Sequence, residues 1–366
     1  MPAKRLLESP LAGAIPAAII ALLVSGLLVA IAGVSPISAY KAIWEGGLGS
    51  SSALGATAVA TLPLLFAALA FAVTFRAGLY NIGIEGQLYM GALASTVVGL
   101  YLHAPRGVVL PAAVIAGMLA GMAWGILPAL LKVWRGVNEI VSSLFLSYIA
   151  IYIVGWLVSG PLEAPGLGVA QSEVIPEAAR FPEIIAGSKL TWAILVALVA
   201  VILVWLLFRT PFGVDLRVLG GSRRVADYVG IDVSRTTIVA FAISGALGGL
   251  AGSVELLGNQ YSLSPEFSPG WGYTGIAVAV LGAGAAWGIA SAALFFGLIG
   301  AAAVELQFTE QLSPDFAVVV QAVALIVVLL GLKLQGQLLL RRSSRQAMEA
   351  EAGADQAAAA GGATVA

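Results

Sequence analysis

The sequence predicts an all-α, polytopic membrane protein with about ten transmembrane helices. Two observations predict this fold class. First, 60% of the 366 residues are hydrophobic and only 10% are charged, whereas a soluble domain carries about 25% charged residues. Second, the mean hydropathy of +0.99 is too high for a protein that hides its apolar side chains in one core. Much of the apolar surface must therefore face lipid.

A membrane-spanning helix needs about 20 consecutive, mostly apolar residues. Besides eight single spans, the sequence contains a longer apolar stretch, Tyr273–Glu305, which is broken by Gly282-Ala283-Gly284 and again by Trp287-Gly288. We interpret this stretch as two helices that meet at a tight turn, the first of them short, so that the total is ten. The eight single spans are Ala12–Ala32, Ala53–Phe75, Leu88–Leu102, Val108–Leu131, Ile140–Ser159, Leu190–Phe208, Thr237–Leu257 and Phe316–Leu332.

The distribution of Lys and Arg predicts the orientation, because cytoplasmic connections carry an excess of both. With the N-terminus in the cytoplasm and ten crossings, 14 basic residues fall on the cytoplasmic side. Only four fall on the opposite side, namely Lys41, Arg106, Arg180 and Lys189. A wrong number of crossings would mix the two sets, so both termini are expected to lie in the cytoplasm, with the helices in the cell (inner) membrane.

On this interpretation, residues 1–340 form one transmembrane domain, and the Ala-, Gly- and Glu-rich tail 341–366 is a disordered cytoplasmic segment. Two connections are long. Residues 161–188 lie on the outer side, are rich in Pro and Gly, and are expected to fold over the outer mouth. Residues 209–235 lie on the cytoplasmic side and hold five of the fourteen cytoplasmic basic residues.

The sequence gives little basis for catalysis or for the binding of metals, nucleotides or nucleic acid. Cysteine is absent, and the only histidine, His103, lies near Pro105 in a short connection. No metal-ligand cluster and no G-x-x-x-x-G-K-[ST] phosphate loop occur, and a net charge of −1 provides no basic field for nucleic acid. We therefore expect a protein that is not an enzyme and that binds no metal or cofactor itself.

The most polar segment within the predicted membrane depth is Tyr80–Gln87. Polar groups at such depth are costly and tend to mark a pathway. Asn81 and Glu85 are four residues apart, so a helix would place them on one face, whereas Gly83 and Gly86 favour an interrupted helix that lines a cavity or packs inside protein. Asn81, Glu85 and Gln87 are therefore candidates for a substrate pathway, for holding the helix break together, or for both.

Polar residues also lie at the ends of other predicted spans. Asn138 and Glu139 open the fifth span; both are candidates for the pathway, and they also suit an N-cap and the first turn of a helix. Glu255 and Glu305 are near the outer ends of their spans, where we expect them to be solvated. A cluster at the outer face belongs either to the interfacial aromatic belt or to a mouth that receives substrate: Asn259, Gln260, Tyr261, Trp271 and Tyr273.

The cytoplasmic segment Arg217–Ile231 predicts a turn, then a short amphipathic helix, then a stop at Gly230. Ser222 is a suitable N-cap for that helix. A short helix between two spans is suited to bind a motor protein. The alternative is a basic helix that is held at the membrane surface by anionic lipid.

Four segments resemble, in the same order, motifs of the permeases of ABC importers for simple sugars and nucleosides. Phe75–Gln87 resembles G-L-x-N-I-G-x-E-G-Q, and Asn138–Leu144 resembles N-E-V-I-x-T-L. Leu216–Ile231 resembles L-R-A-V-G-x-N-x-x-A-A-x-Y-x-G-I, and Gly272–Gly282 resembles G-x-G-F-D-G-I-A-V-A-L-L-G. The resemblance extends from the first helix to Leu332, and the long outer loop is most similar to that of the nucleoside permeases.

This resemblance implies a subunit that moves nucleosides or simple sugars, paired with a second permease copy or paralogue. It also implies two cytoplasmic ATPase subunits, which bind the ATP, and an extracytoplasmic substrate-binding lipoprotein. Asn81, Glu85 and Gln87 would lie along the pathway. The coupling helix, about Ser222–Val229, would dock into the ATPase, and the matching positions of its segment are Gly220, Ser222, Arg223, Arg224, Ala226, Tyr228 and Gly230.

The sequence departs from these motifs at several positions. Arg224 stands where the family carries an acid, Val225 replaces the first alanine of the coupling motif, and Thr274 replaces an aspartate. Such changes are compatible with a heteromeric pair whose other permease carries the missing groups. Two alternatives remain open: a branched-chain amino acid permease of the same superfamily, and an ATP-independent carrier or channel. A proton-driven carrier typically places several ionisable groups at mid-membrane, whereas here only Glu85 is expected to lie deep.

Overall fold

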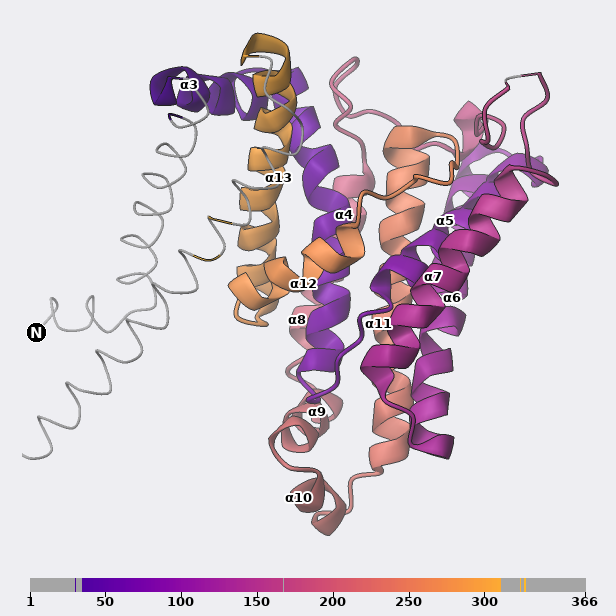
Figure 1. Cartoon of the computed structure of the whole chain (residues 1–366), viewed down its shortest axis with the longest axis vertical. Helices are drawn as coiled ribbons and strands as arrows, with labels where there is room; N and C mark the ends of the chain where they lie inside the picture. Colours follow the sequence, from indigo (N-terminus) through magenta and orange to yellow (C-terminus); the bar gives the residue numbers. More distant parts are fainter. Residues whose placement is uncertain (1–29, 31–34, 167, 311–322, 324–325, 327–366) are drawn as a thin grey trace, which may run out of the picture. The chain divides into compact units, whose positions relative to one another are not determined.

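The computed structural model describes residues 30, 35–166, 168–310, 323 and 326, and these residues contain helices and connections but no strand. The chain divides into two compact units, one of Met1–Ala39 with Asp315–Ala366 and one of Tyr40–Pro314. The elements described below belong to the second unit, apart from the first residues of α3 (Figure 1). The all-α prediction is confirmed for the part of the chain that the structure describes.

The helices are joined mostly by short connections, and one of them ends in a π-helical turn. In chain order they are α3 (Pro36–Gly47), α4 (Ser51–Phe75), α5 (Ile84–Tyr101), α6 (Arg106–Arg135), α7 (Glu139–Val158), the 3-10 turn η1 (Glu177–Ala179), α8 (Ala193–Leu207), α9 (Pro211–Gly221), α10 (Arg223–Tyr228), α11 (Val233–Glu255), the π-helical turn η2 (Leu256–Gln260), α12 (Trp271–Leu281) and α13 (Ala286–Glu310).

Several of these helices meet the requirements for a membrane span, as expected of a multi-pass membrane protein. Within the described residues, α4, α6, α7, α11 with its π-helical end, and Ala286–Ala303 of α13 are long and apolar enough to cross a membrane. The bent pair α8 and α9, which meet at 69°, adds a sixth span if it is counted as one. The predicted spans Ala12–Ala32 and Phe316–Leu332 lie almost entirely outside the described residues.

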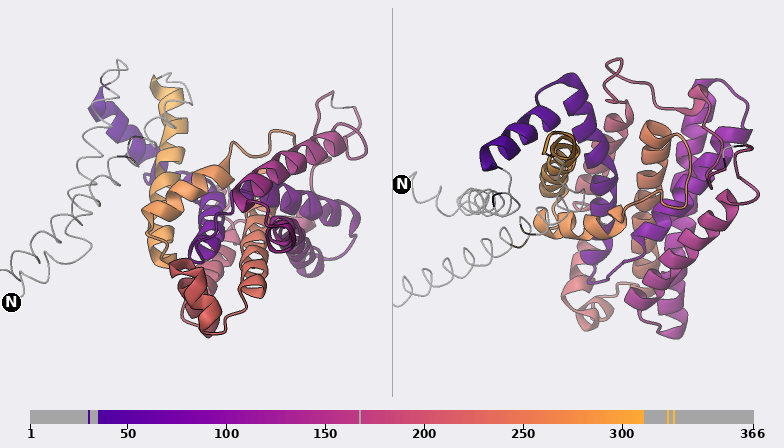
Figure 2. Two further views of the ribbon diagram at one scale, coloured as in Figure 1. Left: turned by 60° about the horizontal axis from the view of Figure 1, so that its bottom comes forward. Right: turned by 45° about the horizontal axis from the view of Figure 1, so that its top comes forward.

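Helix α4 occupies the centre of this unit. It packs against α11, α13, α12 and α8, and every residue from Thr61 to Thr74 is buried. A helix that is apolar on all sides is stable only when neighbours surround it, and the sequence of α4 is of that kind. In Figures 1 and 2, α12 and α13 lie on one side of α4, whereas α5, α6 and α7 lie on the other.

Helices α6 and α11 approach each other through glycine. Gly117, Gly121 and Gly125 are spaced four residues apart, so they share one face of α6, opposite Gly245 and Gly249 of α11. A Cβ on Gly121 would lie within 3 Å of the backbone of both α11 glycines. Helices in lipid associate through small residues that allow such close packing, which explains why this pair of helices tolerates no side chain at the crossing.

The structure confirms two predicted breaks between helices. The long apolar stretch is divided between α12 and α13 by a turn at Gly282–Ala285, in which Ala283 has a φ of 52° and Gly284 a φ of 64°. The interrupted-helix prediction for Tyr80–Gln87 also holds, because Asn81 lies in the connection and α5 begins at Ile84. Asn81 and Glu85 therefore do not share a helix face.

The local structure of Arg217–Gly221 differs from the prediction. The sequence of Arg217–Gly221 was expected to form a turn, but it is the second half of α9. The helix begins with Thr210 as N-cap, whose Oγ1 accepts a hydrogen bond from Gly213 N at 3.3 Å, and with Pro211 at a position where proline favours helix initiation. These two signals override the weak helix propensity of Gly220 and Gly221 at the end of the helix.

Candidate functional site

We call Asn81, Glu85 and Gln87 the polar patch. Their side chains are held in a network of hydrogen bonds within the protein. Asn81, Glu85 and Gln87 are exposed by only 0%, 2% and 1%. The side-chain amides of Asn81 and Gln87 donate to each other in both directions at 3.2 Å. Asn81 Nδ2 also donates to Ser244 Oγ of α11 at 2.9 Å, and Asn81 Oδ1 accepts from Gly83 N at 3.0 Å. These bonds fix the connection before α5 to the start of α5 and to α11.

Two serines of α7 complete the network. Ser143 Oγ accepts a hydrogen bond from Ile82 N at 3.1 Å, and Ser147 Oγ accepts one from Gly86 N at 3.2 Å. Gly86 lies in the first turn of α5, where N–H groups have no partner inside the helix, and Ile82 lies in the connection before it, so these hydroxyls satisfy donors that the helix does not. This role was not among the sequence predictions. The available signal was the spacing of four residues, which places both serines on one face of α7.

Glu85 connects α5 to α12. Its Oε2 accepts a hydrogen bond from Gly272 N at 2.6 Å, at the first turn of α12. A carboxylate near a helix N-terminus is stabilised by the helix dipole. A Cβ on Gly272 would lie within 3 Å of the backbone and the carboxylate of Glu85, so the contact requires glycine. Because Asn81, Glu85 and Gln87 bond to partners inside the protein, the patch braces α5 against α7, α11 and α12.

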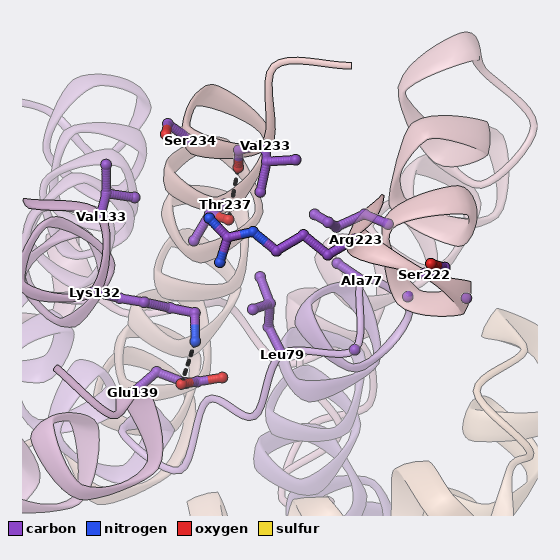
Figure 3. A pocket seen from close by; sticks show the side chains of 14 residues that line it. Ala77, Leu79, Lys132, Val133, Glu139, Ser222, Arg223, Val233, Ser234 and Thr237 are labelled. Atoms are coloured by element: carbon purple, nitrogen blue, oxygen red, sulfur yellow. Dashed lines mark hydrogen bonds and ion pairs between the residues drawn. The ribbon is translucent and has the colours of Figure 1, made fainter. Parts of the chain in front are cut away.

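Asn138 and Glu139 lie elsewhere, at the start of α7. Asn138 is the N-cap, and its Oδ1 accepts a hydrogen bond from Ile140 N at 2.9 Å, as the sequence suggested. Glu139 Oε2 forms an ion pair with Lys132 Nζ of α6 at 2.5 Å. Both partners of this pair line a cavity of about 320 Å³, shown in Figure 3. The opposite wall of that cavity is formed by Gly220, Gly221, Ser222 and Arg223.

The structure thus brings Glu139 to the segment that resembles the coupling region. Figure 3 shows the Arg223 side chain extending from α10 across the cavity towards Thr237 of α11. Within the described part of the chain, no group of three His, Cys, Asp or Glu side chains is placed to hold a metal ion. The polar side chains that line this cavity are the Lys132–Glu139 pair, Arg223 and the hydroxyls of Ser222, Ser234 and Thr237.

Helix α10 forms as the sequence predicts. Ser222 is its N-cap, with Oγ accepting from Val225 N at 3.4 Å. Gly230 has a φ of 83°, and Ile231 N bonds back to Ala226 O at 3.0 Å, which ends the helix. Ala226 is fully buried. On the other side, the segment presents exposed side chains to solvent, most of all Tyr228 at 93%, together with Arg223, Arg224, Val225 and Val229.

Helix α9 contacts the connection between α4 and α5 through the backbone of Gly220. A Cβ on Gly220 would lie within 3 Å of the carbonyl oxygen of Arg76 and close to Gly78 N. Gly78 has a φ of 69°, which favours glycine. The Arg76 guanidinium stacks over Phe208 at 4.1 Å, and burial together with nearby Arg217 lowers the pKa of Arg76. The α9–α10 segment is therefore packed directly on the connection that carries Asn81.

The outer cluster is organised around a buried acid. Glu255 was expected to be solvated, but only 2% of it is exposed, so this prediction was wrong. Its Oε1 accepts hydrogen bonds from Asn259 Nδ2 at 2.6 Å and from Gln260 Nε2 at 3.2 Å. Both donors come from the π-helical turn Leu256–Gln260, whose wider geometry aims the two amides at one carboxylate. Gln260 Nε2 also donates to Phe267 O at 2.9 Å.

The chain is similar to known permeases over most of its length. The family model described as "branched-chain amino acid transport system / permease component" matches residues 53–329. The guanosine ABC transporter permease protein of Bacillus subtilis is 32% identical over 85% of this chain and 91% of its own length. A glucose ABC transporter permease protein of Haloferax volcanii is 32% identical, over 79% of each chain.

A third relative has a similar identity and coverage. The nucleoside ABC transporter permease protein NupB of Lactococcus lactis is 30% identical over 79% of this chain and 82% of its own length. No solved structure matches the chain. The matched region contains the polar patch, the α9–α10 segment and the outer cluster.

Proposed function

We propose that this chain, which belongs to the family of branched-chain amino acid transport system permease components, is the membrane-spanning subunit of an ABC importer for nucleosides or simple sugars. The observation that carries the proposal is the alignment with permeases named for guanosine, glucose and nucleosides over at least 79% of this chain. Their shared substrate feature is a sugar ring. Transport is driven by a separate ATPase, and this chain itself binds no ATP or other cofactor.

The proposed topology has ten transmembrane helices in the inner membrane, with both termini in the cytoplasm. The excess of basic residues on one side, 14 against 4, supports this orientation. It places α9 and α10 at the cytoplasmic face, and it places the 161–188 loop at the outer face. Residues 1–340 form the transmembrane domain, and 341–366 form a cytoplasmic tail.

In the assembled transporter, this chain pairs with a second permease copy or a paralogue. Two ATPase subunits bind at the cytoplasmic face, and a substrate-binding lipoprotein binds at the outer face. The α10 segment is the docking element for the ATPase because it is short, basic and projects an almost fully exposed tyrosine. Asn81, Glu85, Gln87, Asn138 and Glu139 lie along the pathway or control the helices that open it.

Substituting Tyr228 by Asp is expected to weaken ATPase binding by roughly tenfold, because truncating an exposed aromatic anchor typically costs 1 kcal/mol or more at an interface. The stability of the permease should not change, since Tyr228 is 93% exposed. Tyr101→Asp is the matched control, because Tyr101 is also exposed, at 62%, and ends α5 away from the α9–α10 segment. Co-purification of the ATPase with each tagged variant measures the effect. Equal recovery with both variants would remove the docking role from α10.

Uptake by cells that express the whole transporter tests the function itself. Labelled guanosine, glucose, ribose and leucine are supplied in turn, and a parallel strain lacks the ATPase. We expect saturable uptake of guanosine or a sugar that disappears without either subunit. Uptake of leucine alone would indicate that the substrate is a branched-chain amino acid, as the name of the family suggests. Uptake that survives loss of the ATPase would indicate a carrier or channel and contradict the proposal.

A further inference from the structure

A second cavity, of about 400 Å³, lies at the other end of α4 from the α9–α10 segment. It is lined by the first part of α4, by the end of α3, by α13, by Lys189 and by Asn259. Segment α9 instead contacts Arg76, just beyond the last residue of α4. On the proposed topology this cavity is at the outer face, so we refer to it as the outer cavity. Its volume falls within the range of about 300–1,000 Å³ that is typical of small-molecule sites.

The walls of the outer cavity consist of small residues. Ala56 and Ala60 share one face of α4, and Gly300 and Ala301 face them from α13. One turn deeper, α13 closes against α4, because a Cβ on Gly297 would lie within 3 Å of Thr61. The two helices therefore touch at the floor and leave room above it, where side chains of ordinary size would have filled the space.

The mouth of the cavity is polar and carries both signs of charge. Lys189 is held there by a short hairpin, in which Ile184 N donates to Leu190 O at 2.6 Å, and it has a φ of 56°. Non-glycine residues with positive φ cost free energy, and they cluster at functional sites. The neighbouring Ser188 carbonyl rests on Gly55 of α4, where no Cβ would fit.

Two carboxylates and an amide complete the mouth. Glu45 lies on α3, where it is paired with Lys41 at 3.6 Å, and Glu305 lies on α13 beside Gly46. Asn259 is oriented by its bond to the buried Glu255, which occupies Nδ2 only. The π-helical turn that carries Asn259 is a rare feature, often found at functional sites. The mouth therefore combines carboxylate and amide oxygen acceptors with an ammonium donor.

We propose that the outer cavity binds the sugar ring of the transported molecule after it leaves the binding protein. Each sugar hydroxyl both donates and accepts hydrogen bonds, so vicinal hydroxyls match a cavity that is lined by both carboxylates and an ammonium group. Charges of both signs favour an uncharged ligand over an ion. Because no aromatic side chain is among the described residues that line the cavity, the site recognises the sugar and not a nucleobase, which would require a stacking partner. This inference rests on the proposed function.

The test uses the complete transporter in proteoliposomes that contain ATP. The probes are labelled guanosine and glucose, and the unlabelled competitors are guanosine, glucose, guanine, 2′,3′-dideoxyguanosine and leucine. For whichever labelled probe is taken up, we expect competition by sugar-bearing compounds and none by guanine. If guanosine is the substrate, removal of the ribose diol should weaken competition by roughly tenfold, as for the loss of a hydrogen bond to a charged group. Competition by guanine equal to that by guanosine would overturn the proposal.

Two variants test whether the outer cavity recognises the sugar. Glu45→Gln removes a charged acceptor on an exposed side chain, and Ala56→Leu fills the cavity from α4. Each should raise the KM for the sugar-bearing probe by roughly tenfold, and Glu45→Gln should also reduce the preference for guanosine over its dideoxy analogue. Gly155→Leu is the control, because it introduces the same leucine side chain at a position where a Cβ meets nothing within 4 Å. The KM of this variant should not change.

The possible results separate this inference from the proposed function. If wild-type transporter takes up no nucleoside and no simple sugar, the proposed function fails, and the sugar site fails with it. If wild-type transporter takes up one of them but Glu45→Gln retains the wild-type KM and the wild-type preference between the two guanosine analogues, the function stands and the outer cavity is not its site. A thermal melt of each purified complex distinguishes loss of binding by Ala56→Leu from misfolding, and the exposed Glu45→Gln remains informative in either case.

Discussion

Gly220→Ala is expected to reduce substrate uptake by roughly tenfold or more while ATP hydrolysis continues. The new Cβ would lie within 3 Å of the Arg76 carbonyl oxygen. That atom is backbone, so it cannot rotate away as a side chain does, and α9 must move off the connection between α4 and α5. Overpacking of this kind costs about 1–3 kcal/mol. On the proposed function, motion of the α9–α10 segment would then no longer reach the connection that carries Asn81.

Gly221→Ala provides a control one residue away. A Cβ on Gly221 meets nothing within 4 Å, and alanine favours helix over glycine by about 1 kcal/mol in a helix interior. We expect this variant to keep wild-type uptake and stability. Uptake and ATPase activity should be measured in the same proteoliposomes, so that loss of uptake with retained hydrolysis identifies uncoupling. If the two alanine variants behave alike, the contact of Gly220 with Arg76 has no role in transmission.

The family resemblance identified Gly220 as a coupling position, but its contacts could not be predicted, because Arg76 and Gly78 are more than 140 residues away in the chain. Local signals were sufficient for features that depend on neighbours in sequence. The Ser222 cap and the Gly230 stop depend on hydrogen bonds within a few residues, and the structure has both. The end of α9 was missed because the prediction did not consider the Thr210 cap, which begins the helix upstream of the two glycines.

The apolar spans were predictable for the same reason, since a run of apolar residues specifies a helix in lipid without reference to its partners. What the runs do not specify is which faces meet. Glu255 illustrates this limit: its position near a helix end suggested contact with water, yet the π-helical turn folds Asn259 and Gln260 over it. A π-helical turn has no strong sequence signature, so the burial of Glu255 had no visible cause in the sequence.

The composition of the sequence predicted where the polar patch lies, but it did not predict the hydrogen-bond partners of the patch. Asn81 and Glu85 were expected to share a helix face if the helix continued, whereas they have separate tasks in the structure. Asn81 bonds to Gln87 and Ser244, and Glu85 bonds to Gly272. The partners on α11 and α12 are more than 160 residues away from the patch in sequence. Spacing rules within a single helix carry no information about such contacts.

Glu85→Ala is expected to lower uptake by roughly tenfold and to destabilise the permease by about 1–3 kcal/mol, the cost of leaving a buried donor unpaired. The donor is Gly272 N, which bonds to Glu85 Oε2 at 2.6 Å. Glu85→Gln keeps a side-chain oxygen at this position, so it should retain most of the stability. Glu173→Ala, on an exposed side chain of the outer loop, is the control and should leave both quantities unchanged.

The comparison of Glu85→Gln with Glu85→Ala separates the two roles that the patch combines. If the patch only braces α5 against α12, uptake should follow stability, and the glutamine variant should transport nearly as well as wild type. If the carboxylate also lies on the pathway, Glu85→Gln should melt like wild type and still lose uptake, because the charge is gone while the hydrogen bond remains. Asn81→Ala extends the test, since it removes the bonds to Gln87 and Ser244. Failure of both Asn81→Ala and Glu85→Ala to insert into the membrane would assign the patch to folding alone.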